Sequence, residues 1–160
     1  MNYPPTVQTL LTDDAFSQYA TTTSGNQNVL ADLQALDAST FSADGEMAKA
    51  CLSGLWLLHN FLDQSHDISQ DLKTPVGSHW HAIMHRLEGD YSNSKYWYRR
   101  VGQCALYDVI GQRSEKPFDP MEFVDRVEGQ GNEATHDVAV VEWQVLFEHC
   151  FENATSSGGC

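Results

Sequence analysis

The segment from Gly77 to Arg100, GSHWHAIMHRLEGDYSNSKYWYRR, concentrates side chains that can do chemistry. His81, His85 and Glu88 recur at i, i+4 and i+7, so on a helix they share one strip. Imidazoles and carboxylates that project inward from facing helices form the zinc, iron and manganese sites of helical bundles. The strip therefore predicts half of a divalent transition-metal site, whereas His79 lies off it and is expected at the surface.

A second polar strip follows the apolar face of a long helix predicted from about residue 45 to 70. Projected at 100° per residue, the positions that share one arc are Leu52, Leu55, Trp56, His59, Leu62, Asp63, His66 and Gln70. Its polar half faces inward, and an unpaired buried polar group costs roughly 1–3 kcal/mol. We therefore expect the two strips to meet and to line one internal pocket, with a weaker polar contribution from Glu142 and His149 on the last helix.

Two kinds of catalytic site fit this pocket. In the first, a divalent zinc, iron or manganese ion lowers the pKa of a bound water, and its ligands come from the set His59, His66, His81, His85 and Glu88. In the second, which is free of metal, His66 or His85 acts as a general base poised by Asp63 or Glu88. The competing structural interpretation is that the histidines only form hydrogen-bonded pairs with carboxylates in the core.

The second half of the opening segment predicts substrate binding. Arg99 and Arg100 follow Trp97 within about one helical turn, and Arg86 stands one turn before the preceding loop. Guanidinium groups and aromatic donors together suit a carboxylate, phosphate or sugar ligand. The structural alternative pairs Arg86 with Asp90 and packs Trp97 into the core.

The elements that must position these residues are helices, because alternating strand patterns bounded by hairpin turns are missing. We predict an all-α, single-domain bundle of about six to seven helices over residues 1–160, with a flexible tail from about residue 154. Two short helices are expected between Thr12 and Leu36. The others are expected over about 45–70, 79–88 with Ser78 as cap, 92–102 with Ser92 or Asn93 as cap, 104–110, from Pro120 with Asp119 as cap, and 133–152.

Composition narrows the class of protein. The chain has 9 Lys and Arg against 22 Asp and Glu, a formal charge of −13, which disfavours nucleic acid and anionic membranes as partners. We expect a cytoplasmic protein, since the start lacks a signal-peptide pattern and no apolar run would span a bilayer. The cysteines show no metal or disulfide spacing, so Cys51, Cys104 and Cys150 are predicted to be buried and Cys160 exposed.

The stretches LLHNFLDQSHDISQ and GSHWHAIMHRLEGDYSNSKYWYRRVG together resemble an uncharacterised family of small bacterial proteins, over about residues 59–102. That resemblance implies no activity. The leading functional hypothesis is therefore an enzyme, a metal-dependent hydrolase or lyase on a small anionic or polyhydroxy substrate. The alternatives are a non-catalytic ligand-binding or sensor module with the same pocket, and a structural interaction protein whose polar core fixes helix register.

Overall fold

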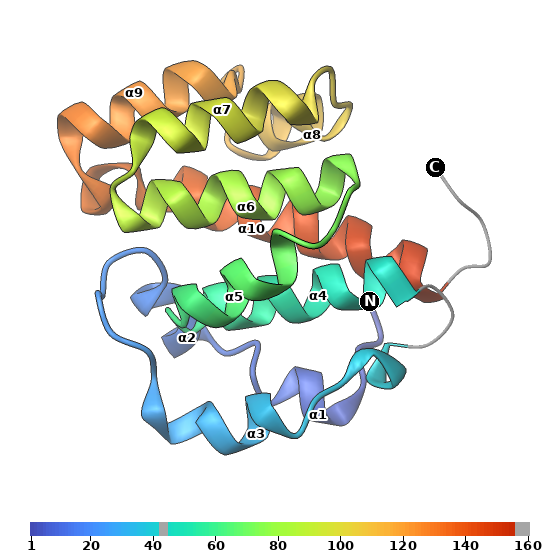
Figure 1. Cartoon of the computed structure of the whole chain (residues 1–160). Helices are drawn as coiled ribbons and strands as arrows, with labels where there is room; N and C mark the ends of the chain where they lie inside the picture. Colours follow the sequence, from blue (N-terminus) through green and yellow to red (C-terminus); the bar gives the residue numbers. More distant parts are fainter. Residues whose placement is uncertain (42–44, 156–160) are drawn as a thin grey trace.

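The computed structural model describes residues 1–41 and 45–155, and these residues form helices and no strand (Figure 1). The α-helices are α1 (Pro5–Gln8), α2 (Asp13–Gln18), α3 (Leu30–Gln34), α4 (Gly45–Leu58), α5 (Leu62–Ser69), α6 (Pro75–Glu88), α7 (Tyr91–Val101), α8 (Leu106–Arg113), α9 (Pro120–Gln130) and α10 (Asn132–Thr155), with 3-10 helices at Gln27–Val29 and Ala38–Thr40. The all-α prediction is confirmed. The described part of the chain has 10 α-helices, more than the six to seven predicted. Among the differences, short α1 went unrecognised and one long predicted helix is divided in two.

That division occurs at Asn60, where the backbone turns left-handed with φ +61°. The Phe61 N–H bonds to the Trp56 carbonyl at 2.9 Å, and the Asn60 N–H bonds to the Leu57 carbonyl at 3.0 Å. These are the paired bonds of a Schellman motif, which ends a helix at a glycine or asparagine. The prediction of one helix over residues 45–70 was wrong for this reason, and α5 leaves α4 in a new direction.

Helix α6 lies at the centre of the bundle. It contacts α4 and α5 on one side and α7 on the other, and α10 runs behind it (Figure 1). Every residue from Val76 to Arg86 is buried, as expected for a helix that is covered all round. A side chain on any face of α6 therefore meets protein rather than water.

Aromatic packing fixes the crossing of α4, α6 and α10. The Trp80 and Trp143 rings lie 6.0 Å apart, Phe147 stacks on Trp143 at 4.6 Å, and the Trp143 indole N–H donates to the Gly54 carbonyl at 2.8 Å. A Cβ added at Gly54 would meet the Trp80 ring at 2.7 Å. Only glycine allows α4 to approach this closely.

The helix starts also differ in part from the predictions. Helix α6 begins at Pro75, one turn early, because Thr74 caps it by accepting a hydrogen bond from the Gly77 N–H at 3.1 Å. Asp90, not Ser92 or Asn93, caps α7. Asp119 caps α9 as predicted, accepting from the Met121 and Glu122 N–H groups.

Two of the three cysteines predicted to be buried are buried, Cys51 and Cys150. Cys104 is partly exposed, because it lies in the loop between α7 and α8 rather than on a helix face. Residues Ala154 and Thr155 belong to α10, and the rest of the predicted flexible tail, Cys160 included, lies outside the described residues. In the part of the chain that the structure describes, no helix combines the length and apolarity that a membrane crossing needs.

Candidate metal centre

Three histidines converge where α5 packs on α6. His66 comes from α5, His81 and His85 come from α6, and one ring nitrogen from each lies within 4.8 Å of the other two. The His66 and His81 ring centroids are 4.7 Å apart, and those of His81 and His85 are 4.8 Å apart. His81 and His85 are buried, whereas the His66 side chain is 36% exposed. The predicted meeting of the two strips is therefore seen for these three residues.

Neighbouring polar groups fix the tautomers of the two buried rings. The Ser69 hydroxyl lies 3.1 Å from His81 Nδ1 and 3.3 Å from the His66 carbonyl, to which it donates, so it accepts from His81 Nδ1–H. The Glu88 carboxylate lies 2.9 Å from His85 Nδ1 and likewise accepts from it. Both Nε2 atoms are thereby left with a lone pair, which is the form that binds metal. At His85 this lone pair accepts from the Asn93 amide at 3.0 Å, so a metal ion would replace that hydrogen bond.

The set suits a metal with an open coordination position. Catalytic zinc sites use three protein ligands, with Zn–N bonds of about 2.05 Å, which places tetrahedral nitrogens roughly 3.3 Å apart. The three nitrogens are within 4.8 Å, so binding requires the rings to draw together. His66 is the most exposed of the three and is the ring with freedom to move.

Several residues near the cluster have roles that sequence reasoning assigned differently or missed. Glu88, predicted as a ligand, instead orients His85. Ser69 was missed because its role depends on α5 turning toward α6, and Asn93, whose amide nitrogen lies 3.0 Å from His85 Nε2, was missed because it comes from α7. Trp97, predicted to bind substrate, covers His81 with ring centroids 4.1 Å apart.

The structure does not bring His59 or Asp63 to this cluster. His59 is the last residue before the Asn60 turn, and its Nε2–H donates to the Leu10 carbonyl at 3.1 Å. It therefore anchors the N-terminal segment to the end of α4. Asp63 is exposed on α5. Both misplacements follow from the break between α4 and α5, which rotates the two halves of the predicted stripe relative to each other.

The three arginines do not gather beside His85. Arg86 is 1% exposed and points into the core, where it pairs with Glu142, not with Asp90. Arg99 is exposed on the other side of α7 and lines a groove next to Cys104. Arg100 alone stays near the metal centre, because its guanidinium carbon lies 5.2 Å from the Trp97 ring that covers His81.

A separate buried polar network occupies the opposite face of α6. Glu142 of α10 is fully buried and accepts hydrogen bonds from Arg86 at 2.6 Å, from Tyr98 at 2.6 Å and from His79 Nε2 at 3.0 Å. Burial by itself would raise the pKa of Glu142, but the Arg86 charge and the His79 hydrogen bond outweigh it and lower the pKa to about 2. The prediction of a surface His79 was wrong, because α6 has no solvent face.

The metal-free cluster should be sensitive to acid. Burial, followed by the neighbouring His85 and His66, lowers the pKa of His81 to about 3. Its unfolded pKa is about 6.5, so the unfolded chain takes up the proton first, and stability present above pH 6.5 is lost as the pH falls. We expect His81 to account for about 2 kcal/mol of unfolding free energy lost between pH 7 and pH 5.

The check is urea denaturation of metal-free protein at both pH values, with wild type compared with His81→Gln. The variant should lose about 2 kcal/mol less than wild type on acidification. Equal acid losses in the two proteins would contradict the prediction.

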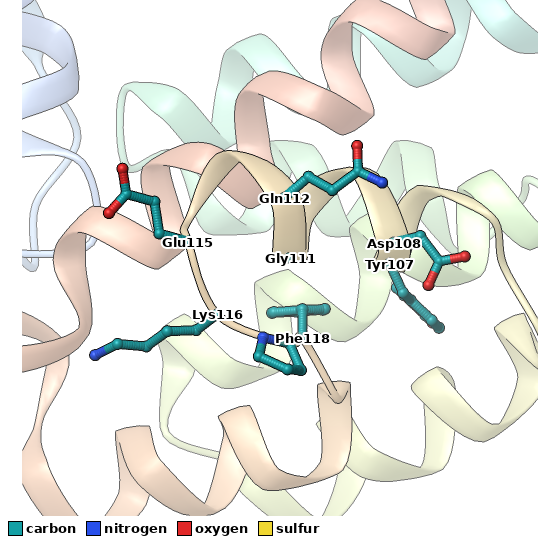
Figure 2. A pocket seen from close by; sticks show the side chains of 8 residues that line it. Tyr107, Asp108, Gly111, Gln112, Glu115, Lys116 and Phe118 are labelled. Atoms are coloured by element: carbon teal, nitrogen blue, oxygen red, sulfur yellow. The ribbon is translucent and has the colours of Figure 1, made fainter.

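Two grooves lie on either side of α8, and neither is lined by His66, His81 or His85. The first, of about 540 Å³, is lined by Tyr107, Asp108, Gly111, Gln112, Glu115, Lys116, Pro117 and Phe118, with Glu115 and Lys116 at one end and Tyr107 and Asp108 at the other (Figure 2). The second, of about 570 Å³, runs past Cys104 between α7 and α9 and shares Tyr107 and Phe118 with the first. A smaller cleft of about 260 Å³ reaches Glu88 from the N-terminal segment.

Comparison of the chain with protein-family models, with curated proteins and with solved structures found no match. The resemblance of residues 59–102 to small bacterial proteins therefore carries no family assignment. Function is therefore inferred from the side chains of the histidine cluster and their neighbours.

Proposed function

We propose that this protein is a metal-dependent hydrolase or lyase whose divalent transition-metal ion is held by His66, His81 and His85. The observation that carries the proposal is the convergence of three ring nitrogens within 4.8 Å, from two helices that are separated along the chain by a loop. Two of the rings are already oriented by Ser69 and Glu88. Imidazoles whose second nitrogen is held by a neighbouring hydroxyl or carboxylate are characteristic of metal ligands.

The number of ligands supports catalysis over a purely structural role. Three protein ligands leave one tetrahedral position open, whereas structural zinc sites use four. A divalent metal so held lowers the pKa of a bound water or polarises a carbonyl or phosphoryl oxygen. Glu88, more than half exposed and hydrogen-bonded to His85, is the carboxylate that we assign as proton acceptor during the reaction.

Charge near the centre favours an anionic substrate. The Trp97 ring packs on His81 with centroids 4.1 Å apart, and the Arg100 guanidinium carbon lies 5.2 Å from the centre of the same indole. An aromatic wall with a guanidinium at its edge can hold a small carboxylate, phosphate ester or sugar phosphate. The acidic surface elsewhere, from a formal charge of −13, discourages polyanions such as nucleic acids.

The proposal predicts one equivalent of bound metal per chain. Protein purified without a metal-affinity tag should contain stoichiometric zinc, iron or manganese by elemental analysis, and metal-free protein should bind one Co²⁺ with the absorption spectrum of a three-histidine site. Hydrolysis of small phosphate and carboxylate esters should be lost on chelation and restored by added metal. A protein that neither contains metal nor binds Co²⁺ would contradict the proposal.

A further inference from the structure

The buried network around Glu142 ends at a cysteine, which the proposed metal chemistry does not use. Glu142 accepts from His79 Nε2–H, so in the neutral form of the His79 ring the lone pair lies on Nδ1. That Nδ1 atom is buried without a hydrogen-bond partner in a side chain that is 1% exposed. The His79 ring packs on Tyr98 and Tyr107 with centroids 5.4 and 5.6 Å apart, and both tyrosines line the groove of about 570 Å³ together with the partly exposed thiol of Cys104.

The surroundings of Cys104 favour the thiolate. Burial by itself would raise the pKa of Cys104, but the nearby His79 side chain and the backbone N–H groups of Leu106 and Tyr107 outweigh burial, so the pKa is lowered. Those amides belong to the first turn of α8, where the helix dipole also stabilises an anion. A partly exposed cysteine next to histidine and at a helix start is the environment of reactive thiols.

A third group completes the arrangement. The Tyr107 hydroxyl is buried without a hydrogen-bond partner, and its ring packs on His79 with centroids 5.6 Å apart. Burial, followed by the charge of Cys104, raises the pKa of Tyr107, so it remains a hydrogen-bond donor. Tyr107 lines the same groove as Cys104. When the Cys104 sulfur attacks a carbonyl carbon there, the carbonyl oxygen becomes an oxyanion that needs such a donor.

We propose that Cys104, His79 and Tyr107 form a nucleophilic cysteine site that opens into the groove between α7, α8 and α9 and takes acyl groups from small activated esters or thioesters. Cys104 Sγ attacks the carbonyl carbon, and its proton passes to His79 Nδ1, which Glu142 holds in position. The carbonyl carbon forms a bond to sulfur and loses its bond to the leaving alcohol or thiol, which takes up the proton. The products are an acyl-cysteine and the free alcohol or thiol, and water can then release the acid.

This site is distinct from the metal centre. His79 and His81 are two residues apart on α6, so their side chains leave the helix on opposite sides. His79 meets Glu142 and Tyr107, whereas His81 meets Ser69 and His66. Reactivity of Cys104 should therefore persist in the presence of a chelator.

The test uses the full chain in chelator at neutral pH with two probes, p-nitrophenyl acetate for acylation and iodoacetamide for alkylation. Labelling of each cysteine is followed by peptide mass spectrometry, with buried Cys51 and Cys150 as internal reporters of the folded state. Cys104 should react with both probes at least about 10-fold faster than glutathione. Release of one equivalent of nitrophenolate should accompany acylation and disappear in Cys104→Ser.

Two variants separate the roles. His79→Gln should slow both reactions about 10-fold or more, whereas Tyr107→Phe should slow acylation alone, because alkylation builds no oxyanion. His136→Gln, a histidine that bonds to the Phe16 carbonyl on another helix, is the matched control and should change neither. If Cys51 or Cys150 becomes reactive in His79→Gln, that variant has lost its fold and its rates are set aside. The proposal is then judged by the rate of wild-type Cys104 relative to glutathione and by the Tyr107→Phe result. Cys104 reacting no faster than glutathione, or equal effects of Tyr107→Phe on both probes, would overturn the proposal.

Discussion

Replacing Glu142 by glutamine is expected to destabilise the protein by about 3–5 kcal/mol, the typical cost of breaking a buried ion pair. Glu142 is 0% and Arg86 1% exposed, and their closest N–O distance is 2.6 Å. The substitution keeps the volume of the side chain but leaves the Arg86 guanidinium as an unpaired buried charge, since its other neighbours are the Tyr98 hydroxyl and the Phe123 ring. A cost of this size is a large part of the total stability of a domain, about 5–15 kcal/mol.

The same helix supplies a matched control. Glu148 pairs with Arg113 at the same distance, 2.6 Å, but their side chains are 27% and 44% exposed. Glu148→Gln should therefore cost less than about 1 kcal/mol, as exposed pairs do. Chemical denaturation of both variants measures the difference, and comparable losses would show that burial does not govern the energy of the Glu142 pair.

A double variant tests the physical cause. Arg86→Met combined with Glu142→Met removes both charges and fills the space with apolar side chains. It should be more stable than Glu142→Gln alone, because no buried charge is left without a partner. A double variant no better than the single one would show that Tyr98 and His79 depend on Glu142 for their own positions.

Replacing His66 by alanine is expected to abolish the stabilisation of the protein by metal while changing the metal-free protein little. Ligand binding to the folded state alone stabilises by RT ln(1 + [L]/Kd), about 4 kcal/mol at 1,000 times Kd. Loss of a group that hydrogen-bonds to a metal ligand weakens metal affinity by up to about 100-fold, and loss of a ligand itself should weaken it more. His66→Ala should therefore remove at least about 2.7 kcal/mol of the stabilisation by metal. His66 is suited to the test because it is the most exposed of the three histidines.

Thermal melts with and without Zn²⁺, and with a chelator, measure this effect. His59→Gln is the informative control, because His59 was predicted as a ligand but bonds to the Leu10 carbonyl instead. This variant should melt at a lower temperature than wild type yet keep the full shift on adding Zn²⁺. A shift that survives in His66→Ala, or disappears in His59→Gln, would contradict the three-histidine assignment. Melts in acid do not replace this test, because the metal-free cluster is itself sensitive to acid.

The sequence by itself determined the helical class and the strip on α6. Helical spacing alone places His81 and His85 on one face, since residues four apart in a helix are neighbours whatever surrounds them. The Asp119 cap and the Pro120 start of α9 are likewise local, because cap and helix lie within one turn. His66 was also predicted to meet this strip, but from the projection of one continuous helix over residues 45–70, which the Asn60 turn divides.

Only the tertiary structure decided which residues join these strips. The Asn60 turn separates His59 from His66, and its left-handed backbone is held partly by a hydrogen bond from the Asn60 amide to Thr22, 38 residues away. The burial of α6 on every side placed His79 and Arg86 in the core against Glu142, more than 50 residues distant. Periodicity reports which side chains share a face, whereas the partner of that face depends on how distant helices pack, and no local pattern encodes it.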